Sequence, residues 1–248
     1  MKIIKQGIVA LGLSFATATS FADVLGLSAS LTFWYPELSG DIRSGGDNID
    51  VSNDLGLGDK EAFIFTGAFE HPVPIIPNVR IQLMDSDQVA HGTVNNVVFD
   101  GQTFDGDVQT SLDLTNYDFT LYYEILDNWV NLDLGLTAKV FDGELILRAQ
   151  DPNSPALSKT DIDDVIPMLY GSASFDLPIT SFSAGVEGNV FSLDDDTVYD
   201  VVARLRYQFG FFGAEVGYRA MAVKIDGGKG VDVDATQDGP YLSALLLF

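Results

Sequence analysis

The sequence predicts an all-β fold, a transmembrane antiparallel β-barrel of ten strands, from three observations. Apolar and polar residues alternate in about ten segments, a stretch typical of exported proteins stands at the N-terminus, and the last alternating segment ends on Phe248. Alternating residues point to opposite faces of a strand, whereas a helix repeats about every 3.6 residues. A barrel with an apolar outer face and a polar lumen explains these strands.

Residues 1–22 have the features of a secretory signal peptide. Lys2 and Lys5 precede a short apolar core, and residues 20–22 form a small-x-small cleavage site. The apolar core is shorter than the ~20 residues that a membrane-spanning helix needs. We therefore expect residues 1–22 to be removed and residues 23–248 to form a single barrel domain. The chain has no cysteine, so disulfides and lipoprotein anchoring are not expected.

The alternation is clearest in residues 130–140. Leu134 and Leu136 lie on one face of this segment, and Asp133 and Lys139 lie on the other. Charged residues are unusual on the buried face of a soluble sandwich, whereas they suit a polar lumen. A bulge at Gly143 could prolong this strand to residue 148. Four similar segments precede it, at residues 25–35 and 62–70, from residue 79, and up to residue 125.

Five further strands complete the predicted barrel. They lie at residues 165–175, 182–190, 199–209, 212–219 and 241–248. Pro167 interrupts the first of them, and because proline lacks a ladder donor we expect it near the loop end of its strand. If two of the weaker segments are loops, the barrel has eight strands instead. Aromatic residues at strand ends, including residues 33–35 and Trp129, predict girdles at both membrane boundaries.

The connections alternate in length along the chain. Tight links at 127–128, 177–178 and 210–211 and a proline-rich one at 72–78 are followed by long acidic segments, at 37–60, 85–110, 142–164 and 226–239. Short periplasmic turns and long extracellular loops are typical of outer-membrane barrels. We therefore predict the outer membrane of a Gram-negative bacterium as the location. A formal net charge of −23 makes nucleic acid an unsuitable partner. Membrane lipid and lipopolysaccharide are the expected surroundings of a monomer.

The C-terminal strand places Leu242, Leu246 and Phe248 on one face. This pattern resembles the signal by which the bacterial outer-membrane assembly machinery recognises its substrates. Together with the chain's size, its signal peptide and the pair Gly227–Gly228 in the last long loop, it resembles a family of small gammaproteobacterial outer-membrane β-barrel proteins named for a Gly-Gly motif. The resemblance implies an outer-membrane location and no established activity, so it brings no catalytic residues.

A set of charged residues is predicted to point into the lumen. Ten strands are closer to the filled eight-stranded barrels than to open porins, so a wide pore is not expected. An unpaired charge in a narrow lumen is costly, so we expect cross-lumen ion pairs, with a narrow ion conduit as the alternative. The set comprises Glu70, Arg80, Asp118, Glu124, Asp133, Lys139, Asp176, Glu187, Asp200, Arg204, Arg206, Glu215 and Arg219.

No catalytic constellation is evident, so we do not expect an enzyme. Asp85 and Asp87 are similar to the paired aspartates of the omptin proteases, which also use an Asp-x-His element. The chain has two histidines, His71 and His91, and neither follows an aspartate by two residues. The sequence therefore predicts a structural, surface-interaction or limited-permeability role. The alternative is an outer-membrane hydrolase that acts on lipid or peptide at the extracellular rim.

Two acidic groups in the predicted loops could bind Ca²⁺ or Mg²⁺, which prefer oxygen ligands. Neither group matches a complete calcium-loop spacing, so ordinary solvated loops are the alternative. No other cofactor is expected. The candidate ligands are Asp161, Asp163, Asp164, Asp194, Asp195 and Asp196.

Overall fold

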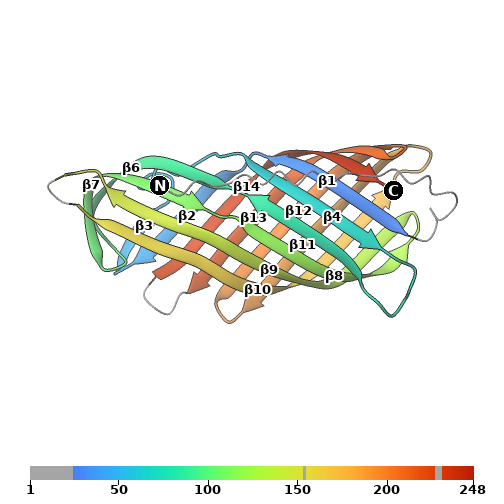
Figure 1. Cartoon of the computed structure of the whole chain (residues 1–248), viewed down its shortest axis with the longest axis horizontal. Coiled ribbons are helices and arrows are strands. Elements are labelled where there is room, and N and C mark those ends of the chain that lie inside the picture. The colour runs from blue at the N-terminus through green and yellow to red at the C-terminus, as the bar shows by residue number, and fades with distance from the viewer. Residues whose placement is uncertain (1–24, 153–154, 227–230) are drawn as a thin grey trace, which may run out of the picture.

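The computed structural model describes residues 25–152, 155–226 and 231–248, which form an all-β closed barrel. Each barrel strand pairs antiparallel with the next, and β1 pairs with β14 to close the sheet (Figure 1). The prediction of ten barrel strands is confirmed, and the alternative of eight is wrong. The strands are β1 (Gly26–Trp34), β4 (Ala62–Glu70), β5 (Asn78–Asp85), β8 (Asn116–Asp127), β9 (Val130–Ala149), β10 (Leu157–Asp176), β11 (Phe182–Leu193), β12 (Asp196–Phe209), β13 (Phe212–Asp226) and β14 (Val231–Leu247).

The predicted signal peptide, residues 1–22, and the pair Gly227–Gly228 lie outside the described residues. Within the described residues, no helix is long and apolar enough to cross a membrane.

The outer face of the barrel carries an apolar belt to which every barrel strand contributes. Large aliphatic or aromatic side chains point outward at mid-strand and are strongly exposed, up to 63% for Leu136 and Leu169. Such a continuous apolar surface is unfavourable in water and suits contact with lipid. One member from each strand in sheet order gives Leu31, Phe65, Leu83, Leu121, Leu136, Leu169, Val186, Leu205, Val216 and Leu242.

Two details of the predicted strands are wrong. β9 does continue to Ala149, but the ladder passes through Gly143, opposite Ile162, without a bulge. The register shift lies instead in β8, between Glu124 and Leu126. Pro167 lies in the middle of β10 rather than near a loop. Because β11 pairs with β10 only from Leu169 onward, β10 has one neighbouring strand at Pro167, and proline is tolerated there as on an edge.

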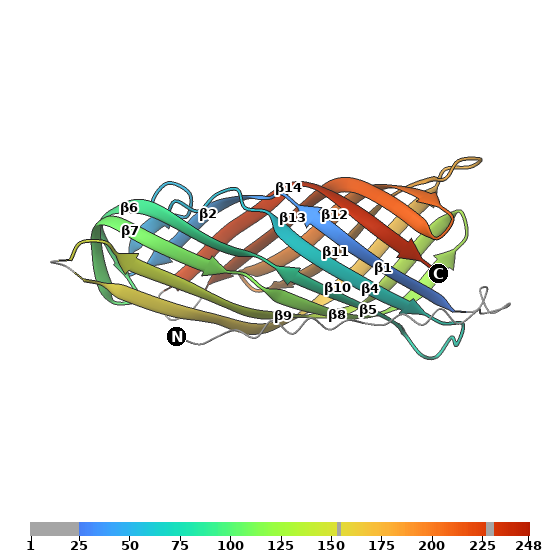
Figure 2. The same cartoon turned by 45° about the horizontal axis from the view of Figure 1, so that its top comes forward.

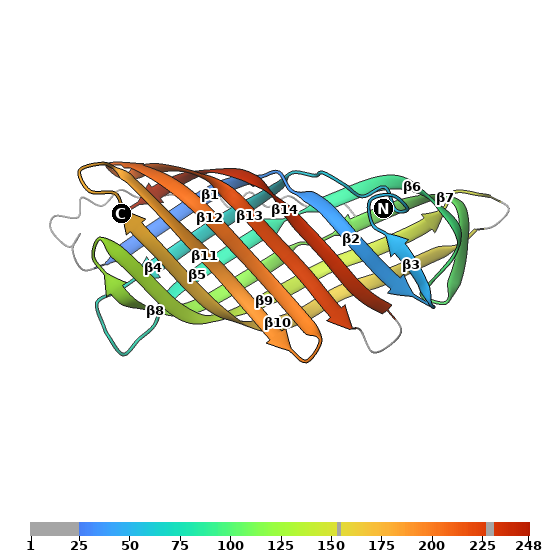
Figure 3. The same ribbon diagram turned by 180° about the vertical axis from the view of Figure 1, so that it is seen from behind.

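Most of the predicted long loops are in fact strands. Segments 37–60 and 85–110 contain β2 (Glu37–Ser44), β3 (Asp47–Asp50), β6 (Asp87–Phe99) and most of β7 (Gln102–Asp113). Figure 3 shows β2 beside β14, where it replaces β1, and β7 replaces β8 beside β9 in the same way. Segment 142–164 consists largely of the extended ends of β9 and β10, and residues 231–239 belong to β14.

These added strands build an extension that we call the cap. It comprises β2, β3, β6, β7, residues 51–60 and the adjoining ends of β9, β10 and β14. Figure 2 shows β6 and β7 at the end of the barrel opposite to the C-terminus. By the topology of outer-membrane barrels, the short turns at the other end are periplasmic and the cap is extracellular.

The cap has its own apolar core where the barrel lumen would otherwise continue. Its side chains come from all four added strands, from residues 51–57 and from β9. The buried members are Leu38, Ile42, Ile49, Val51, Leu55, Leu57, Ala90, Val94, Val97, Phe99, Phe104, Val108, Leu145 and Leu147.

Candidate functional site

The lumen gathers most of the charged residues that the sequence places inside. Nine of them line a cavity in the half of the barrel near the short turns. Asp118, Lys139 and Asp200 are buried outside its lining. Asp176 is the exception, because it lies at the end of β10 and is exposed. The nine that line the cavity are Glu70, Arg80, Glu124, Asp133, Glu187, Arg204, Arg206, Glu215 and Arg219.

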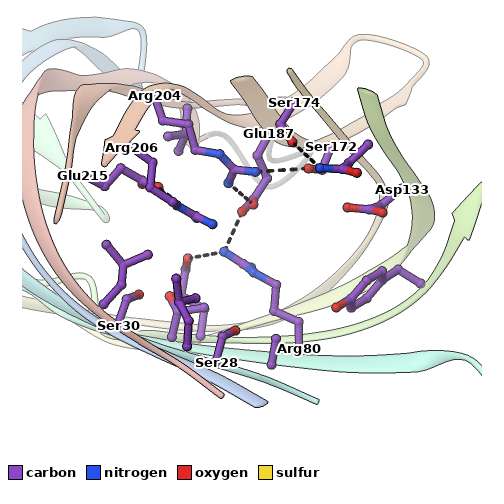
Figure 4. A pocket seen from close by; sticks show the side chains of 18 of the residues that line it. Ser28, Ser30, Arg80, Asp133, Ser172, Ser174, Glu187, Arg204, Arg206 and Glu215 are labelled. Carbon is purple, nitrogen blue, oxygen red and sulfur yellow. Dashed lines mark hydrogen bonds and ion pairs between the residues drawn. The ribbon is translucent and has the colours of Figure 1, made fainter. Parts of the chain in front are cut away.

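The cavity has a volume of about 300 Å³, and an ion-pair triad crosses it. Arg80 on β5 contacts Glu187 on β11 at 2.5 Å, and Arg204 on β12 contacts the other carboxylate oxygen at 2.7 Å (Figure 4). Arg204 also donates to the Ser172 hydroxyl at 3.3 Å. Three strands separate β5 from β11 in the sheet, so the triad links two distant parts of the barrel wall across the lumen.

A second ion pair lines the neighbouring wall. Arg206 contacts Glu215 at 2.9 Å, and the Tyr241 hydroxyl donates to the same carboxylate at 2.8 Å. Both oxygens of this carboxylate therefore have partners, which lowers the cost of its burial.

The remaining acidic residues of the cavity lie together on β4, β8 and β9. Glu124 and Asp133 stand opposite one another in the β8–β9 ladder, and Glu70 accepts a hydrogen bond of 2.8 Å from Tyr122. Within the described residues none of these three carboxylates forms an ion pair. These three carboxylates make this part of the cavity wall acidic, whereas Glu187 and Glu215 are each paired with arginine.

A fully buried charge network, which we call the middle layer, lies between the cavity and the cap. The Lys139 ammonium contacts Asp118 at 2.8 Å, Asp200 at 3.2 Å and the Asn116 amide oxygen at 3.2 Å. Arg219 contacts the same Asp200 at 2.6 Å. The Lys139 side chain is 0% exposed, and among the described residues Asp118 and Asp200 are the carboxylates that compensate its charge.

Neutral side chains complete the middle layer, and sequence reasoning did not single them out. Thr137 on β9 donates to Asn189 on β11 at 2.6 Å and is 2.8 Å from the Thr120 hydroxyl. Trp34, predicted in an outer girdle, points inward instead, with the Arg219 guanidinium 5.1 Å from its ring. Strand alternation contained this signal, because Trp34 has the parity of the inward-facing residues of β1.

The cap closes the lumen above the middle layer. Where two turns meet at its tip, Asp47 accepts from the Val98 amide at 2.8 Å and the Ser158 hydroxyl donates to Asp100 at 3.2 Å. Residues 51–57 lie directly against β6. A Cβ added to Gly56, whose φ is +72°, would come within 2.1 Å of the His91 carbonyl oxygen. The barrel interior is therefore filled at two levels above the cavity.

The candidate catalytic residues are not brought together. Asp85 ends β5 and Asp87 begins β6, and both are exposed. His91 lies further along β6, opposite Gln109, and the His71 ring bonds only to backbone groups of Val73 and Pro77 near the turn end. Within the described residues, neither histidine ring is hydrogen bonded to a carboxylate.

The candidate metal ligands lie at one corner of the barrel. Asp161, Asp163 and Asp164 are exposed on β10, and Asp194 to Asp196 form the turn between β11 and β12. Among the described residues, no group of three or more acidic, histidine or cysteine side chains is arranged to hold a metal ion.

The C-terminal residues close the barrel at the turn end. Leu242 and Leu246 belong to the apolar belt. Phe248 stacks on Phe211 with ring centroids 5.9 Å apart, and its backbone exchanges two hydrogen bonds with Leu27, at 2.8 and 3.0 Å.

No family model and no curated protein matches this sequence. Among solved structures, the chain is similar to the outer membrane protease OmpT from Escherichia coli, with a TM-score of 0.53, 11% identity and coverage of 95% of this chain and 100% of that one. Two matches with lower TM-scores are outer membrane protein AlkL (0.35, 13% identity, 95% of each chain) and the attachment invasion locus protein Ail of Yersinia pestis (0.34, 11% identity, 90% of this chain and 99% of that one). The chain thus has the fold of bacterial outer-membrane β-barrel proteins, consistent with an outer-membrane location.

Proposed function

We propose that this protein is a non-enzymatic outer-membrane barrel with a sealed lumen, whose cap carries a structural or surface-interaction role. The observation that supports this most is the fully buried Lys139 clamped between Asp118 and Asp200 beneath an apolar core. An ion crossing the barrel would have to break that network and then enter a region without polar partners, and both steps are costly.

Planar-bilayer recording of the refolded protein tests the seal. We expect no stable conductance steps, because the middle layer and the cap core block the lumen in series. Insertion must be verified on the same preparation, by resistance of the vesicle-bound protein to urea extraction, so that silence does not reflect failed insertion. Large, stable porin-like steps from verified barrels would refute the proposal.

The alternative of a rim hydrolase has weaker support. The similarity to OmpT concerns the fold alone, and Asp85 and Asp87 have no histidine hydrogen bonded to them in the described part of the chain. Incubation of the refolded protein with fluorogenic peptides or with lipopolysaccharide tests this point. Hydrolysis that disappears in a His91→Ala variant would replace the non-enzymatic proposal.

The expected partners belong to the same proposal. Membrane lipid meets the apolar belt, and lipopolysaccharide surrounds the base of the cap of a monomeric barrel. The strand that ends at Phe248 is the segment offered to the outer-membrane assembly machinery. Ca²⁺ or Mg²⁺ could bridge the exposed aspartates of β10 and of the β11–β12 turn to lipid phosphates. We also propose that the protein is a member of the small outer-membrane β-barrel family named for a Gly-Gly motif.

A further inference from the structure

β10 has an unpaired edge on the side of the barrel away from β9. Its residues pair with β9 from Leu157 to Phe175, but with β11 only from Leu169 onward. The Leu157 amide donates to the Gln102 side chain at 3.4 Å, so we call residues 158–168 the free edge of β10; Figure 1 shows this part of the strand, in gold, running toward the cap. A strand without a neighbour presents a row of backbone N–H and C=O groups that can pair with another chain.

The free edge has no neighbouring strand because the β11–β12 hairpin is shorter than the β9–β10 hairpin. β11 turns into β12 at Asp194 and Asp195, soon after Val190, the last residue that pairs with β10. Asp164 has the parity of the inward-facing residues of β10 and is nevertheless exposed. The inner side of the strand is therefore open to solvent at this point, as expected where no neighbouring strand continues the wall.

The outer surface beside the free edge carries like charges in opposed positions. Asp163 stands opposite Asp142, and Asp161 stands opposite Glu144 in the β9–β10 ladder. Lys159 contacts Glu144 and Asp161, and these hydrogen-bonded carboxylates raise the pKa of the lysine. Like charges placed directly opposite one another destabilise a sheet.

Three carboxylates in this region have no cation or hydrogen-bond donor beside them among the described residues. Within the described residues, Asp142, Asp163 and Asp164 take part in no hydrogen bond or ion pair through their side chains. Successive outward residues of a strand are about 6.6–6.8 Å apart, whereas Ca²⁺ ligands converge to about 2.3–2.6 Å from the ion. Asp163 and Asp142 lie on neighbouring strands and Asp164 lies on the other face, so these charges do not converge on one ion and suit a partner with several separate cationic side chains.

We propose that the free edge of β10 docks an extended, lysine- or arginine-rich polypeptide from outside the cell by β-strand addition. This inference rests on the proposed surface role of the cap region. Backbone hydrogen bonds to the edge supply affinity, and the attraction of basic side chains to Asp163, and to Asp142 beside it on β9, supplies selectivity. The same charges make a second copy of this chain a poor partner, because two acidic edges repel each other.

A fluorescent peptide of alternating lysine and threonine, about as long as the free edge, is the probe. It is titrated against the full refolded protein in detergent micelles, and binding is read by fluorescence anisotropy. Two N-methylated versions, one modified at the lysines and one at the threonines, test strand addition. In an added strand alternate residues direct their N–H groups toward the edge, so one version should bind about tenfold or more weakly and the other should bind normally.

The protein variant Asp142→Asn/Asp163→Asn tests the location. We expect it to weaken peptide binding roughly five- to tenfold, since it removes two exposed carboxylates whose charge no cation of this chain's described residues offsets. The matched control is Asp59→Asn/Asp87→Asn, which changes the net charge equally at exposed positions away from β10 and should bind as the parent does.

Three results would overturn the inference. They are equal binding of both N-methylated peptides, equal weakening in the two protein variants, and self-association of the protein through this edge without peptide. Bilayer conductance is recorded on the same proteins, so that the two proposals fail separately. Peptide binding by a conducting barrel would overturn only the sealed lumen, and a silent barrel without peptide binding would overturn only the docking site.

Discussion

Lys139 shows at the scale of one residue how the lumen is held shut. Its ammonium lies among Asp118, Asp200 and the Asn116 amide, and water does not reach it. Arg219 is the second cation that contacts Asp200. The network is therefore close to neutral, with two cations against two anions, and each group depends on the others.

Replacement of this lysine should destabilise the barrel strongly. Lys139→Met leaves Asp118 buried without a cation, and we expect the free energy of unfolding to fall by about 3–5 kcal/mol. Urea titration of the vesicle-inserted protein, followed by tryptophan fluorescence, measures this change. Lys159→Met is the control, because its ion pairs are solvent-exposed and should contribute only about 0–1 kcal/mol. Equal effects of the two substitutions would show that Lys139 is not confined as described.

At the scale of the element, β9 directs alternate side chains to the lipid-facing outside of the barrel and to the lumen. Leu136 on the belt is 63% exposed, and Asn131 on the same strand lines the cavity. Thr137 and Lys139 on the inward side are buried. The strand therefore meets lipid, a polar cavity and a dry charge network along its length.

This separation predicts unequal effects of the same new residue. Leu136→Arg places a guanidinium near the bilayer midplane and should cost about 2–4 kcal/mol, whereas Asn131→Arg enters a polar cavity and should cost much less. Folding yield and urea midpoint in lipid vesicles measure both. Comparable losses would mean that Leu136 does not face lipid.

The same periodicity also shows where sequence reasoning reaches its limit. The ten barrel strands were predictable because lipid on one side and charge on the other keep the alternation strict. The cap strands were not. In β6 both Val94 and Val97 are buried, because a register shift between them, with Asn96 at a φ of 50°, reverses the alternation. Many acidic and glycine residues in these segments then favoured a loop interpretation.

The sequence predicts which charged residues face the lumen, but it does not predict what surrounds each of them. Inward parity located Arg80, Glu187 and Lys139, but it could not indicate that Lys139 lies in a dry layer while Arg80 borders a cavity. That difference depends on the cap core, whose residues come from segments far apart in the sequence, as Leu38 and Phe104 illustrate.

At the scale of the whole molecule, the cap and the membrane section should unfold together. β9, β10 and β14 run without interruption through both parts. The cap core and the middle layer are therefore joined by continuous backbone ladders, and cooperative two-state behaviour is expected.

Phe104→Ala tests this coupling across the length of the barrel. Phe104 is 0% exposed in the cap core, and its truncation should cost about 3–5 kcal/mol. In a Trp34→Phe background, fluorescence of Trp129 at the turn end should show the same shift in urea midpoint as proteolysis of the cap. Val89→Ala, at a residue that is 59% exposed on β6, should shift neither. A cap that is lost while the Trp129 transition stays unchanged would mean two independent units.

The seam between β1 and β14 has a consequence for the time course of folding. Ser28 pairs with Leu247 and Trp34 pairs with Tyr241, so the two strands most distant along the chain are neighbours in the barrel. The sheet cannot close until the last residues have been synthesised and delivered. Contacts of such long sequence separation make folding slow, and during that interval the apolar belt residues need protection from aggregation.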